Sequence, residues 1–449
     1  MRSALRLLAL TSLAAAAAGV ACSVDTEGTG EPAPTGGDDA GSDVTTGGPD
    51  GAVTDDGGGG DTAQPPVDAG PETATTKCKA ANCALSIAAG PAHTCAILGD
   101  RTVKCWGENI HGELGSGTQD GGNVLPQMNA TPTLVQGIAG AASISLGGTL
   151  GIKAFSCALL GGGSVRCWGA NDLGQLGAKT DASVSLDAVT VSADAAATQI
   201  DVGLRHGCML DSAGALRCWG LNFFGERGNP ELSAWSLPTD AGLASVSAGH
   251  GTTFVRTTDG KLICMGTNAN GECRPGSDAG TVGPGLVDAG GFVEDISASV
   301  NFACATLTGN ATSCWGSTGN SRLGTGGTPG ATALPGSPLF SPGFAPTRVA
   351  AGGAHACAIM SDRGVSCWGS NTRGQAGDFS GKDPVTTPSG VGGLGKVVQL
   401  ALGGGHSCAL TEDGDVYCWG VNNRGQLALP TPDGSVDNAS HPDPVKVPL

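Results

Sequence analysis

Pairs of cysteine residues ten positions apart are the residues of this sequence whose types and spacing most clearly suggest a chemical role. Cys357 and Cys367 form one such pair in "HACAIMSDRGVSCWG", and a tryptophan and a glycine follow the second cysteine. His355 stands two residues before the first cysteine. The pattern is compatible with two kinds of chemistry: a disulfide between the cysteines, or a zinc site built from histidine and cysteine ligands.

Hairpin geometry favours the disulfide. Residues ten apart across a four-residue turn face each other on a β-hairpin, with Cα atoms about 4.5–5.5 Å apart, within the range a disulfide requires. We therefore predict six disulfides within hairpins: Cys95–Cys105, Cys157–Cys167, Cys208–Cys218, Cys304–Cys314, Cys357–Cys367 and Cys408–Cys418. Phe254 occupies the position that would pair with Cys264, so we predict Cys264–Cys273, and we expect Cys78 and Cys83 to pair with each other just before the ring.

No catalytic motif is evident. The sequence has no Gly-x-Ser-x-Gly, no His-Glu-x-x-His and no phosphate-binding loop. "TEDGDVYCW" resembles the Asp-box of sialidase propellers, but the single tyrosine, Tyr417, lies inside a repeated strand, where a sialidase nucleophile would not be expected. Asp-Gly pairs such as Asp413-Gly414 are more typical of hairpin turns than of a calcium site. We expect no catalytic residue, no metal and no cofactor.

The cysteine pairs belong to seven copies of one unit. The second cysteine of each copy falls at positions 105, 167, 218, 264, 314, 367 and 418, a spacing of 46 to 62 residues. A period near 50 residues is typical of propellers and solenoids. Each unit contains the hairpin, a short apolar segment before it such as "VAAG", and often a proline and valine further upstream, as in "APTRV". Four short strands per unit predict an all-β propeller.

The repeated residues resemble those of the regulator of chromosome condensation family. The resemblance rests on His-x-Cys and on "V-x-C-W-G-x-N-x-x-G-Q-L-G", and it extends from about residue 84 to the end of the chain. It implies a seven-bladed β-propeller. Since the repeats start inside a blade with "SIAAG" and end on "PDPVKVPL", we expect the two ends of the repeat region to share one blade and so close the ring. The histidines at one repeat position are expected to be structural and to lie toward the ring axis; they are His93, His206, His355 and His406.

The N-terminus is typical of an export signal. Two arginines precede an apolar stretch that ends in small residues, and "GVAC" at 19–22 resembles the bacterial lipobox. We predict a signal peptide at 1–21 and a lipid on Cys22; cleavage after Ala21 to give a secreted protein is the alternative. The 17 cysteines are an odd number, and lipidation of Cys22 leaves 16 to pair in an oxidising compartment.

Residues 22–77 are predicted to be a disordered tether. The segment 23–76 carries 12 acidic residues and no basic one, and its apolar content is too low to offset the entropy of ordering. The domain boundaries that follow are 1–21, 22–77 and 78–449. The net charge of the whole chain is −17, which disfavours a nucleic-acid partner, because phosphate binding needs clustered lysine and arginine.

The copies differ at two positions between the asparagine and the glycine of "N-x-x-G". A ring of unlike side chains on a repeated scaffold is a plausible binding surface, and aromatic residues and arginine are the usual anchors of interfaces. The candidate residues for partner binding are His111, Phe223, Phe224, Arg373 and Arg424, with Trp235 from outside the repeat pattern. The alternative is that these positions are loops without a role.

The resulting hypothesis is a monomeric, membrane-tethered, extracytoplasmic module that binds a protein or a glycan, in the outer membrane or on the cell surface of a bacterium. Two alternatives remain. Guanine nucleotide exchange follows from the family resemblance alone, and a propeller enzyme acting on glycans would require paired acids that sequence cannot locate.

Overall fold

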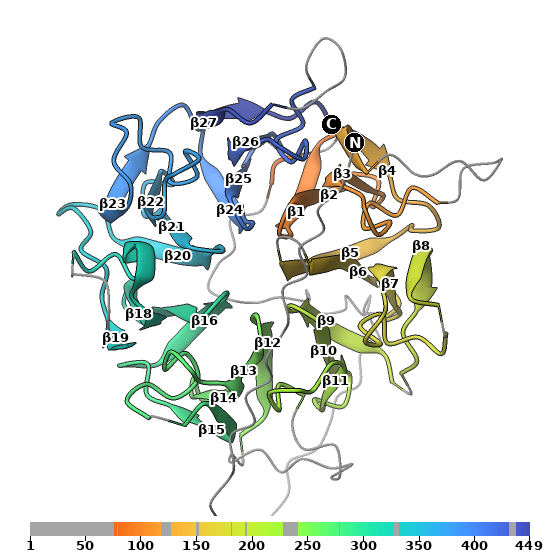
Figure 1. Ribbon diagram of the computed structural model, residues 1–449, viewed down its shortest axis with the longest axis horizontal. Helices are drawn as coiled ribbons and strands as arrows, with labels where there is room; N and C mark the ends of the chain where they lie inside the picture. The colour runs from red at the N-terminus through yellow and green to blue at the C-terminus, as the bar shows by residue number, and fades with distance from the viewer. Residues whose placement is uncertain are drawn as a thin grey trace, which may run out of the picture. The chain divides into compact units, whose positions relative to one another are not determined.

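The fold is described by a computed structural model that covers residues 76–449 apart from 79, 118–126, 150–151, 181, 194, 228–240, 278, 327–331 and 431–436. Within these residues the strands form seven antiparallel sheets, each of which is one blade of a propeller (Figure 1). The predicted seven-bladed, all-β fold is therefore confirmed. Six blades have four strands each, and blade 3 has three among the described residues.

The blades follow one another along the chain. Blade 1 comprises β1 (Ala84–Ala89), β2 (His93–Leu98), β3 (Val103–Glu108) and β4 (Met128–Leu134), and blade 2 comprises β5 (Ala141–Thr149), β6 (Ile152–Leu160), β7 (Val165–Ala170) and β8 (Val184–Thr190). Blade 3 comprises β9 (Ala197–Val202), β10 (His206–Asp211) and β11 (Leu216–Gly220), and blade 4 comprises β12 (Leu243–Ala248), β13 (Thr252–Thr257), β14 (Leu262–Thr267) and β15 (Thr281–Val287). Blade 5 comprises β16 (Val293–Ala298), β17 (Phe302–Leu307), β18 (Ala311–Ser317) and β19 (Thr332–Gly336), with a 3₁₀ helix, η1, at Gly319–Ser321. Blade 6 comprises β20 (Pro346–Ala351), β21 (His355–Met360), β22 (Val365–Gly369) and β23 (Val385–Val391), and blade 7 comprises β24 (Val397–Leu402), β25 (His406–Thr411), β26 (Val416–Val421) and β27 (Ser440–Lys446).

The first strand of every blade faces the centre of the ring and the last strand lies on the rim (Figure 1). The second strands, such as "HTCAIL" in β2 and "HACAIM" in β21, are buried along their whole length. One hydrophobic cluster joins residues of β1 and β2 to residues of β25 and β26, and another joins blade 1 to blade 2. The core thus lies between neighbouring blades, which explains why each unit needs its neighbours in order to fold.

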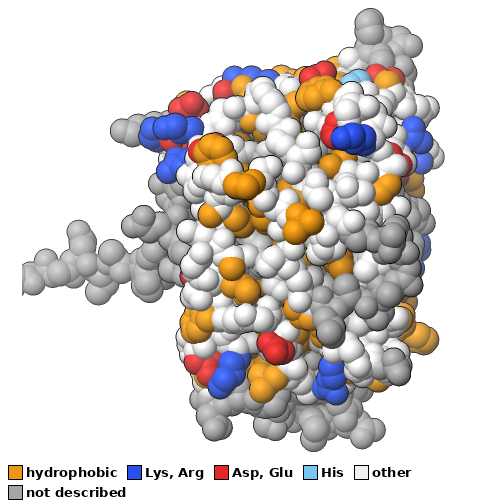
Figure 2. Space-filling view, turned by 90° about the vertical axis from the view of Figure 1, so that its left-hand side faces the viewer, with side chains coloured by type: hydrophobic (Ala, Val, Ile, Leu, Met, Phe, Trp, Pro, Cys, Tyr) orange, Lys and Arg blue, Asp and Glu red, His pale blue; other side chains and the backbone are white. Residues whose placement is uncertain are grey.

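The outer rim has no large apolar area in the view that Figure 2 gives. Hydrophobic side chains there form small separate groups among polar and backbone atoms, and charged side chains gather toward the edges (Figure 2). None of the helical segments in the described part of the chain has the length and apolar character needed to cross a membrane.

All eight predicted disulfides are present. The six hairpin pairs are directly opposed in register, with Cα atoms 4.0–4.1 Å apart. Cys264–Cys273 joins β14 to the loop that follows it, and Cys78–Cys83 closes a short loop before β1. Because these sixteen cysteines are paired with each other, the zinc alternative is wrong. Eight disulfides indicate an oxidising, extracytoplasmic compartment.

The expected closure of the ring by a shared blade is wrong. The last strand, β27, pairs with β26 in blade 7, and β1 is the first strand of blade 1, so both terminal blades are made of consecutive strands. The ring closes by contacts between blades instead. The Gln399 side chain in β24 bonds both the N–H and the C=O of Ile87 in β1, at 3.0 Å each. Proline and valine do not mark one strand of the unit: "APTRV" enters β20, the first strand of blade 6, whereas "PDPVK" belongs to β27, the last strand of blade 7, which is why the expected closure fails.

Candidate functional site

The antiparallel topology places the repeated loops on one side of the ring. In each blade the connection from the first to the second strand and the connection from the third to the fourth strand lie at the same end of the strands. We call this side the loop face; it carries the "N-x-x-G" loops. The opposite side, the turn face, carries the tight turns between the second and third strands, such as 99–102 in blade 1.

The loops on the loop face are held by their own buried polar side chains. In blade 2 the Asn171 Oδ1 accepts the N–H of Leu176 at 3.1 Å, and the Gln175 Oε1 accepts the N–H of Leu173 at 2.8 Å. Equivalent bonds recur in blades 1, 3, 4, 6 and 7, with glutamate replacing the glutamine in blades 1, 3 and 4. The backbone of these six loops is therefore held in place, and the variable residues lie at the tips of the loops.

The same loops bind the next blade. The backbone carbonyl of Glu113 in blade 1 accepts the indole N–H of Trp168 in blade 2 at 2.9 Å. The other tryptophans of the repeat donate in the same way across their seams: Trp106 to Gln426, Trp219 to Gln175, Trp315 to Glu272, Trp368 to Arg322 and Trp419 to Gln375. The "C-W-G" tryptophan is thus a connector between blades.

The four histidines add a second bond at some seams. The His93 Nε2 lies 3.0 Å from the Ser156 Oγ of the next blade, and that hydroxyl donates to the Glu113 carbonyl at 2.9 Å. His206 with Thr253, His355 with Ser407, and His406 with Thr94 repeat this arrangement. Because the hydroxyl gives its only proton to the carbonyl, the hydrogen-bond network assigns the N–H of each imidazole to Nε2.

These histidines are neutral. Burial lowers the pKa of His93 and His355 to about 3 and the pKa of His206 and His406 to about 4. None of the four lines the central channel, so their expected position toward the ring axis is wrong. They lie between blades, with the ring of His93 packed against Gly90, where a Cβ would come within 2.4 Å of the imidazole. Their role is structural.

The three seams that lack the histidine also lack the hydroxyl. Phe155, Thr252 and Phe302 stand at the histidine position of blades 2, 4 and 5. The facing residues of the next blades are Gly207, Ala303 and Ala356. Histidine therefore occurs at the four seams where the next blade supplies serine or threonine. This correlation is present in the sequence, but it is found only when each unit is compared with the unit that follows it.

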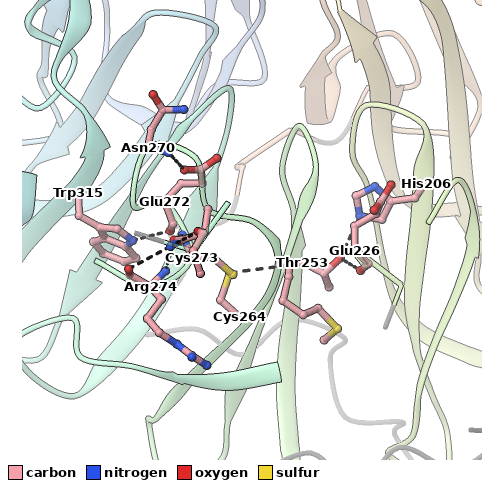
Figure 3. Close-up of a disulfide and its surroundings, with 12 residues drawn as sticks. His206, Glu226, Thr253, Cys264, Asn270, Glu272, Cys273, Arg274 and Trp315 are labelled. Carbon is pink, nitrogen blue, oxygen red and sulfur yellow. Dashed lines mark hydrogen bonds between the residues drawn. A yellow bond between two sulfur atoms is a disulfide. The ribbon is translucent and has the colours of Figure 1, made fainter. Parts of the chain in front are cut away.

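Blade 4 departs most from the repeat. The Cys264–Cys273 disulfide ties β14 to the loop that carries Asn270 and Glu272, directly beside Trp315 of blade 5 (Figure 3). On the other side of the same blade, Thr253 bridges His206 and the Glu226 carbonyl (Figure 3). Met265 replaces the tryptophan of this blade, so the seam with blade 3 has no indole bond, and the Thr253 hydroxyl alone donates to the Glu226 carbonyl there, at 2.7 Å.

The structure spreads the predicted binding residues around the loop face. Phe223 is 78% exposed and packs edge-to-face on the half-buried Phe224, with ring centroids 5.0 Å apart. His111 in blade 1 is half-buried, and Arg373 in blade 6 is exposed. Arg424 in blade 7 forms an ion pair with Glu108, with an Nε–Oε1 distance of 3.1 Å. Only Phe223 and Phe224 lie together, and Trp235 is outside the described residues.

The central channel has a volume of about 620 Å³ and is lined by the first strands of the blades. Among the residues that line the channel, Asp201 carries the one carboxylate. The Asp201 oxygens accept the Ser145 hydroxyl at 2.6 Å and the N–H groups of Val202 and Ala248 at 3.0 and 2.8 Å. Burial raises the pKa of Asp201. Because its acceptor sites are used within the protein, Asp201 ties blades 2, 3 and 4 together rather than offering a site for a ligand.

Sequence reasoning missed Arg205 and His250, which lie in turns next to the loop that carries Phe223 and Phe224. Arg205 lies in the turn before β10, and its carbonyl accepts the N–H of Leu221 at 2.9 Å, so it adjoins the loop of blade 3. Burial lowers the pKa of His250 in blade 4, and the charge of Arg205 lowers it further. The turns that carry Arg205 and His250 are outside the variable "N-x-x-G" positions, and only the packing of blade 3 against blade 4 brings them together.

Comparison with known proteins finds the same repeats. Two family models, both described as Regulator of chromosome condensation (RCC1) repeat, match the chain, one at residues 85–113, 153–175, 197–226, 244–272, 347–375 and 397–426, and the other at 413–449. Human E3 ubiquitin-protein ligase HERC2 is 28% identical over 360 residues, which cover 77% of this chain and 7% of the ligase. The chain therefore spans a small part of that relative. The mitochondrial RCC1 domain-containing protein RUG3 of Arabidopsis thaliana is 26% identical over 357 residues, 72% of this chain and 78% of the relative.

Solved structures share the fold. Human WBSCR16 superposes with a TM-score of 0.67 at 20% sequence identity, covering 78% of this chain and 94% of the other. Yeast RCC1 (Prp20), solved bound to Kap60, superposes with a TM-score of 0.65 at 20% identity, covering 77% and 83% of the two chains. At this level of identity the likeness is one of fold.

Proposed function

The chain is a seven-bladed propeller of regulator of chromosome condensation repeats, and from that premise we propose that it is a non-catalytic module that binds a protein partner through its loop face. The observation that carries the proposal is Phe223. An aromatic side chain that is 78% exposed on a loop with an ordered backbone costs little entropy to bind and offers a large apolar contact.

The held backbone and the varying side chains of the loops also support the loop face as the binding face. The asparagine and glutamine or glutamate of each loop hold the backbone, so the variable side chains are displayed in a fixed arrangement. Rigid display of a few anchors is how most interfaces obtain their affinity. A yeast protein of the same fold was solved bound to Kap60, and another structure of Prp20p reports binding to Gsp1p and histones. Protein binding is the property that we carry over as a proposal, without those partners.

The point where the chain enters the propeller supports tethering from the other side. Lys77 bonds to Glu412 in the turn between β25 and β26, through its N–H at 2.6 Å and its ammonium at 3.2 Å. That turn is on the turn face. A lipid on Cys22, which lies outside the described residues together with the signal peptide and the acidic tether, would therefore connect to the propeller at the turn face and leave the loop face free.

The binding experiment uses the full-length chain in its oxidised form as bait for cell-envelope and culture proteins. We expect a partner that is captured by the natural chain and lost from the double variant Phe223→Ala, Phe224→Ala. Phe292→Ala is the matched control, since Phe292 is 45% exposed and lies beside Gly260 on the turn face. Capture that survives the double variant, or is lost with the control, contradicts the use of the loop face.

Tethering has its own test. Replacement of Cys22 by alanine should move the protein from the membrane fraction to the soluble fraction after cell disruption, because the lipid is the only anchor proposed. A Cys22→Ala variant that stays in the membrane fraction would contradict lipidation at this residue.

A further inference from the structure

The surroundings of Phe223 extend the proposed function to the chemistry of the partner. Phe224 reaches across the seam to blade 4, where a Cβ on Gly251 would lie 2.9 Å from its Cδ2. The N–H of Phe224 also donates to the buried Glu226 Oε2 at 2.7 Å. Phe224 is thus fixed by two blades, and Phe223 stands on it as the exposed half of an aromatic pair.

A cation lies in the turn next to the loop that carries this pair. The Leu221 N–H, two residues before Phe223, donates to the backbone carbonyl of Arg205 at 2.9 Å. Among the described residues it forms no ion pair, whereas the nearby Lys153 has Asp172 at 3.6 Å. Burial raises the pKa of Asp172, but the Gln175 amide and the charges of Lys153 and Arg205 outweigh it, so the pKa is lowered overall. The charge of Arg205 thus acts on Asp172 of blade 2 and on His250 of blade 4.

We propose that Arg205, Phe223 and Phe224 bind an acidic, apolar segment of the partner protein, with a carboxylate on Arg205 and the adjacent aromatic or aliphatic side chain on Phe223. A guanidinium pairs with carboxylate in bidentate geometry, and an aromatic anchor beside it is the usual composition of a hot spot. This inference rests on the proposed function, because it takes the loop face as the binding face.

Single-stranded nucleic acid also uses aromatic and arginine side chains, but it requires a basic groove that follows the phosphates. The chain carries a net charge of −17, which disfavours a ligand with a phosphate at every residue more than a peptide with one carboxylate. A protein carboxylate next to an apolar residue needs one cation, and Arg205 is the cation that we propose for it.

The experiment selects ligands from a phage library of random twelve-residue peptides on the full-length, oxidised chain. Enriched peptides are synthesised, and their affinities for the variants are measured by fluorescence anisotropy. We expect aspartate or glutamate next to an aromatic or aliphatic residue, with affinity at least about tenfold weaker for Arg205→Gln and for Phe223→Ala, a loss typical of a hot-spot contact. Phe379→Ala, which removes another exposed aromatic on the loop face, is the matched control and should leave the affinity unchanged.

A charge reversal makes the test independent of a general loss of folding. Arg205→Glu should prefer the version of the selected peptide in which lysine replaces the acidic residue. Basic consensus peptides, no enrichment, affinity unaffected by Arg205→Gln, or displacement of the peptide by a twelve-residue oligothymidine would each overturn the inference. If capture of the partner still depends on Phe223 in any of these cases, the proposed function stands and only the carboxylate chemistry is wrong. A peptide corresponding to residues 23–76 that displaces the selected peptide would identify this chain's own acidic segment as the occupant, and that result would also overturn the inference.

Discussion

The seams between blades and the tips of the loop-face loops are formed by the same loops, but the seams depend on backbone atoms and the tips depend on side chains. At the seams the backbone carbonyl of one loop residue accepts an indole N–H in six of the seven blades, whatever side chain that residue carries. At the tips two residues vary from copy to copy, from Ile110-His111 to Phe223-Phe224. The seam uses the backbone and so tolerates glutamine, glutamate or arginine, whereas the tip uses the side chain. Stability should therefore respond to seam changes, and binding to tip changes.

The largest expected effect on stability comes from removing a seam tryptophan. Trp168 is fully buried and donates to the Glu113 carbonyl, so Trp168→Ala leaves a cavity and removes one of the two bonds that this carbonyl accepts, while the Ser156 bond remains. We expect the free energy of unfolding to fall by about 3–5 kcal/mol, measured by urea denaturation of the oxidised protein. A loss below about 1 kcal/mol would break the distinction between seam and tip.

Glu113→Gln should stabilise the protein in alkaline solution. Burial raises the pKa of Glu113 to about 7, above its ordinary value of 4.5, so the folded state binds more protons than the unfolded state between these values. Stability from this site is thus lost as the pH rises from 4.5 to about 7. The difference corresponds to about 3 kcal/mol at most, gained by Glu113→Gln at pH 8 and absent at pH 4.5.

The reverse change gives the control. Gln175 holds the same place in blade 2, where its Nε2 donates to Asp172 at 3.0 Å. Gln175→Glu should destabilise the protein at pH 8 and have less effect at pH 4.5. If each substitution changed the free energy of unfolding by the same amount at pH 8 as at pH 4.5, the buried charge would not be responsible.

A seam that contains histidine and serine should be convertible into a seam that contains phenylalanine and alanine. Ser407→Ala leaves the buried His355 N–H without an acceptor, which we expect to cost about 1–3 kcal/mol. Adding His355→Phe copies the Phe302–Ala356 seam and should recover most of the loss. A double-mutant cycle by urea denaturation measures the coupling. If the double variant is less stable than either single variant, the two kinds of seam are not interchangeable.

Acid should weaken the histidine seams. Because burial holds the pKa of His355 at about 3, far below its ordinary 6.5, the unfolded state binds a proton that the folded state does not. Stability is present above pH 6.5 and falls as the pH drops toward 3, by up to about 1.4 kcal/mol per pH unit for each histidine. The variant His355→Phe, Ser407→Ala should show a shallower fall between pH 6 and 4 than the natural chain, and an identical fall would contradict this cause.

The sequence predicted what a single unit determines. The turn and the ten-residue spacing predict each hairpin disulfide, and the loss of the hairpin partner at Phe254 was enough to assign Cys264 to Cys273. The closing strand was assigned to the wrong blade because a repeat pattern has a period but no marked starting point. Nothing within β27 indicates whether it belongs before or after its neighbour.

The candidate site was predicted only where the variable position itself provides the feature. Phe223 was found because it lies at that position. Arg205 and His250 were missed because each is an ordinary turn residue until blades 3 and 4 pack together. The histidine partners were within reach of the sequence, since Ser156 and Ser407 stand where the preceding blade carries histidine, but the relation appears only when successive units are compared.

The most direct test of the account is a paired measurement on Phe223→Ala: its free energy of unfolding, and its affinity for the peptide selected on the natural chain. Since the side chain is 78% exposed, the account predicts a stability within about 0.5 kcal/mol of the natural chain and an affinity at least about tenfold weaker. Unchanged affinity, or a loss of affinity accompanied by an equal loss of stability, would contradict the claim that the tips bind while the seams hold the ring.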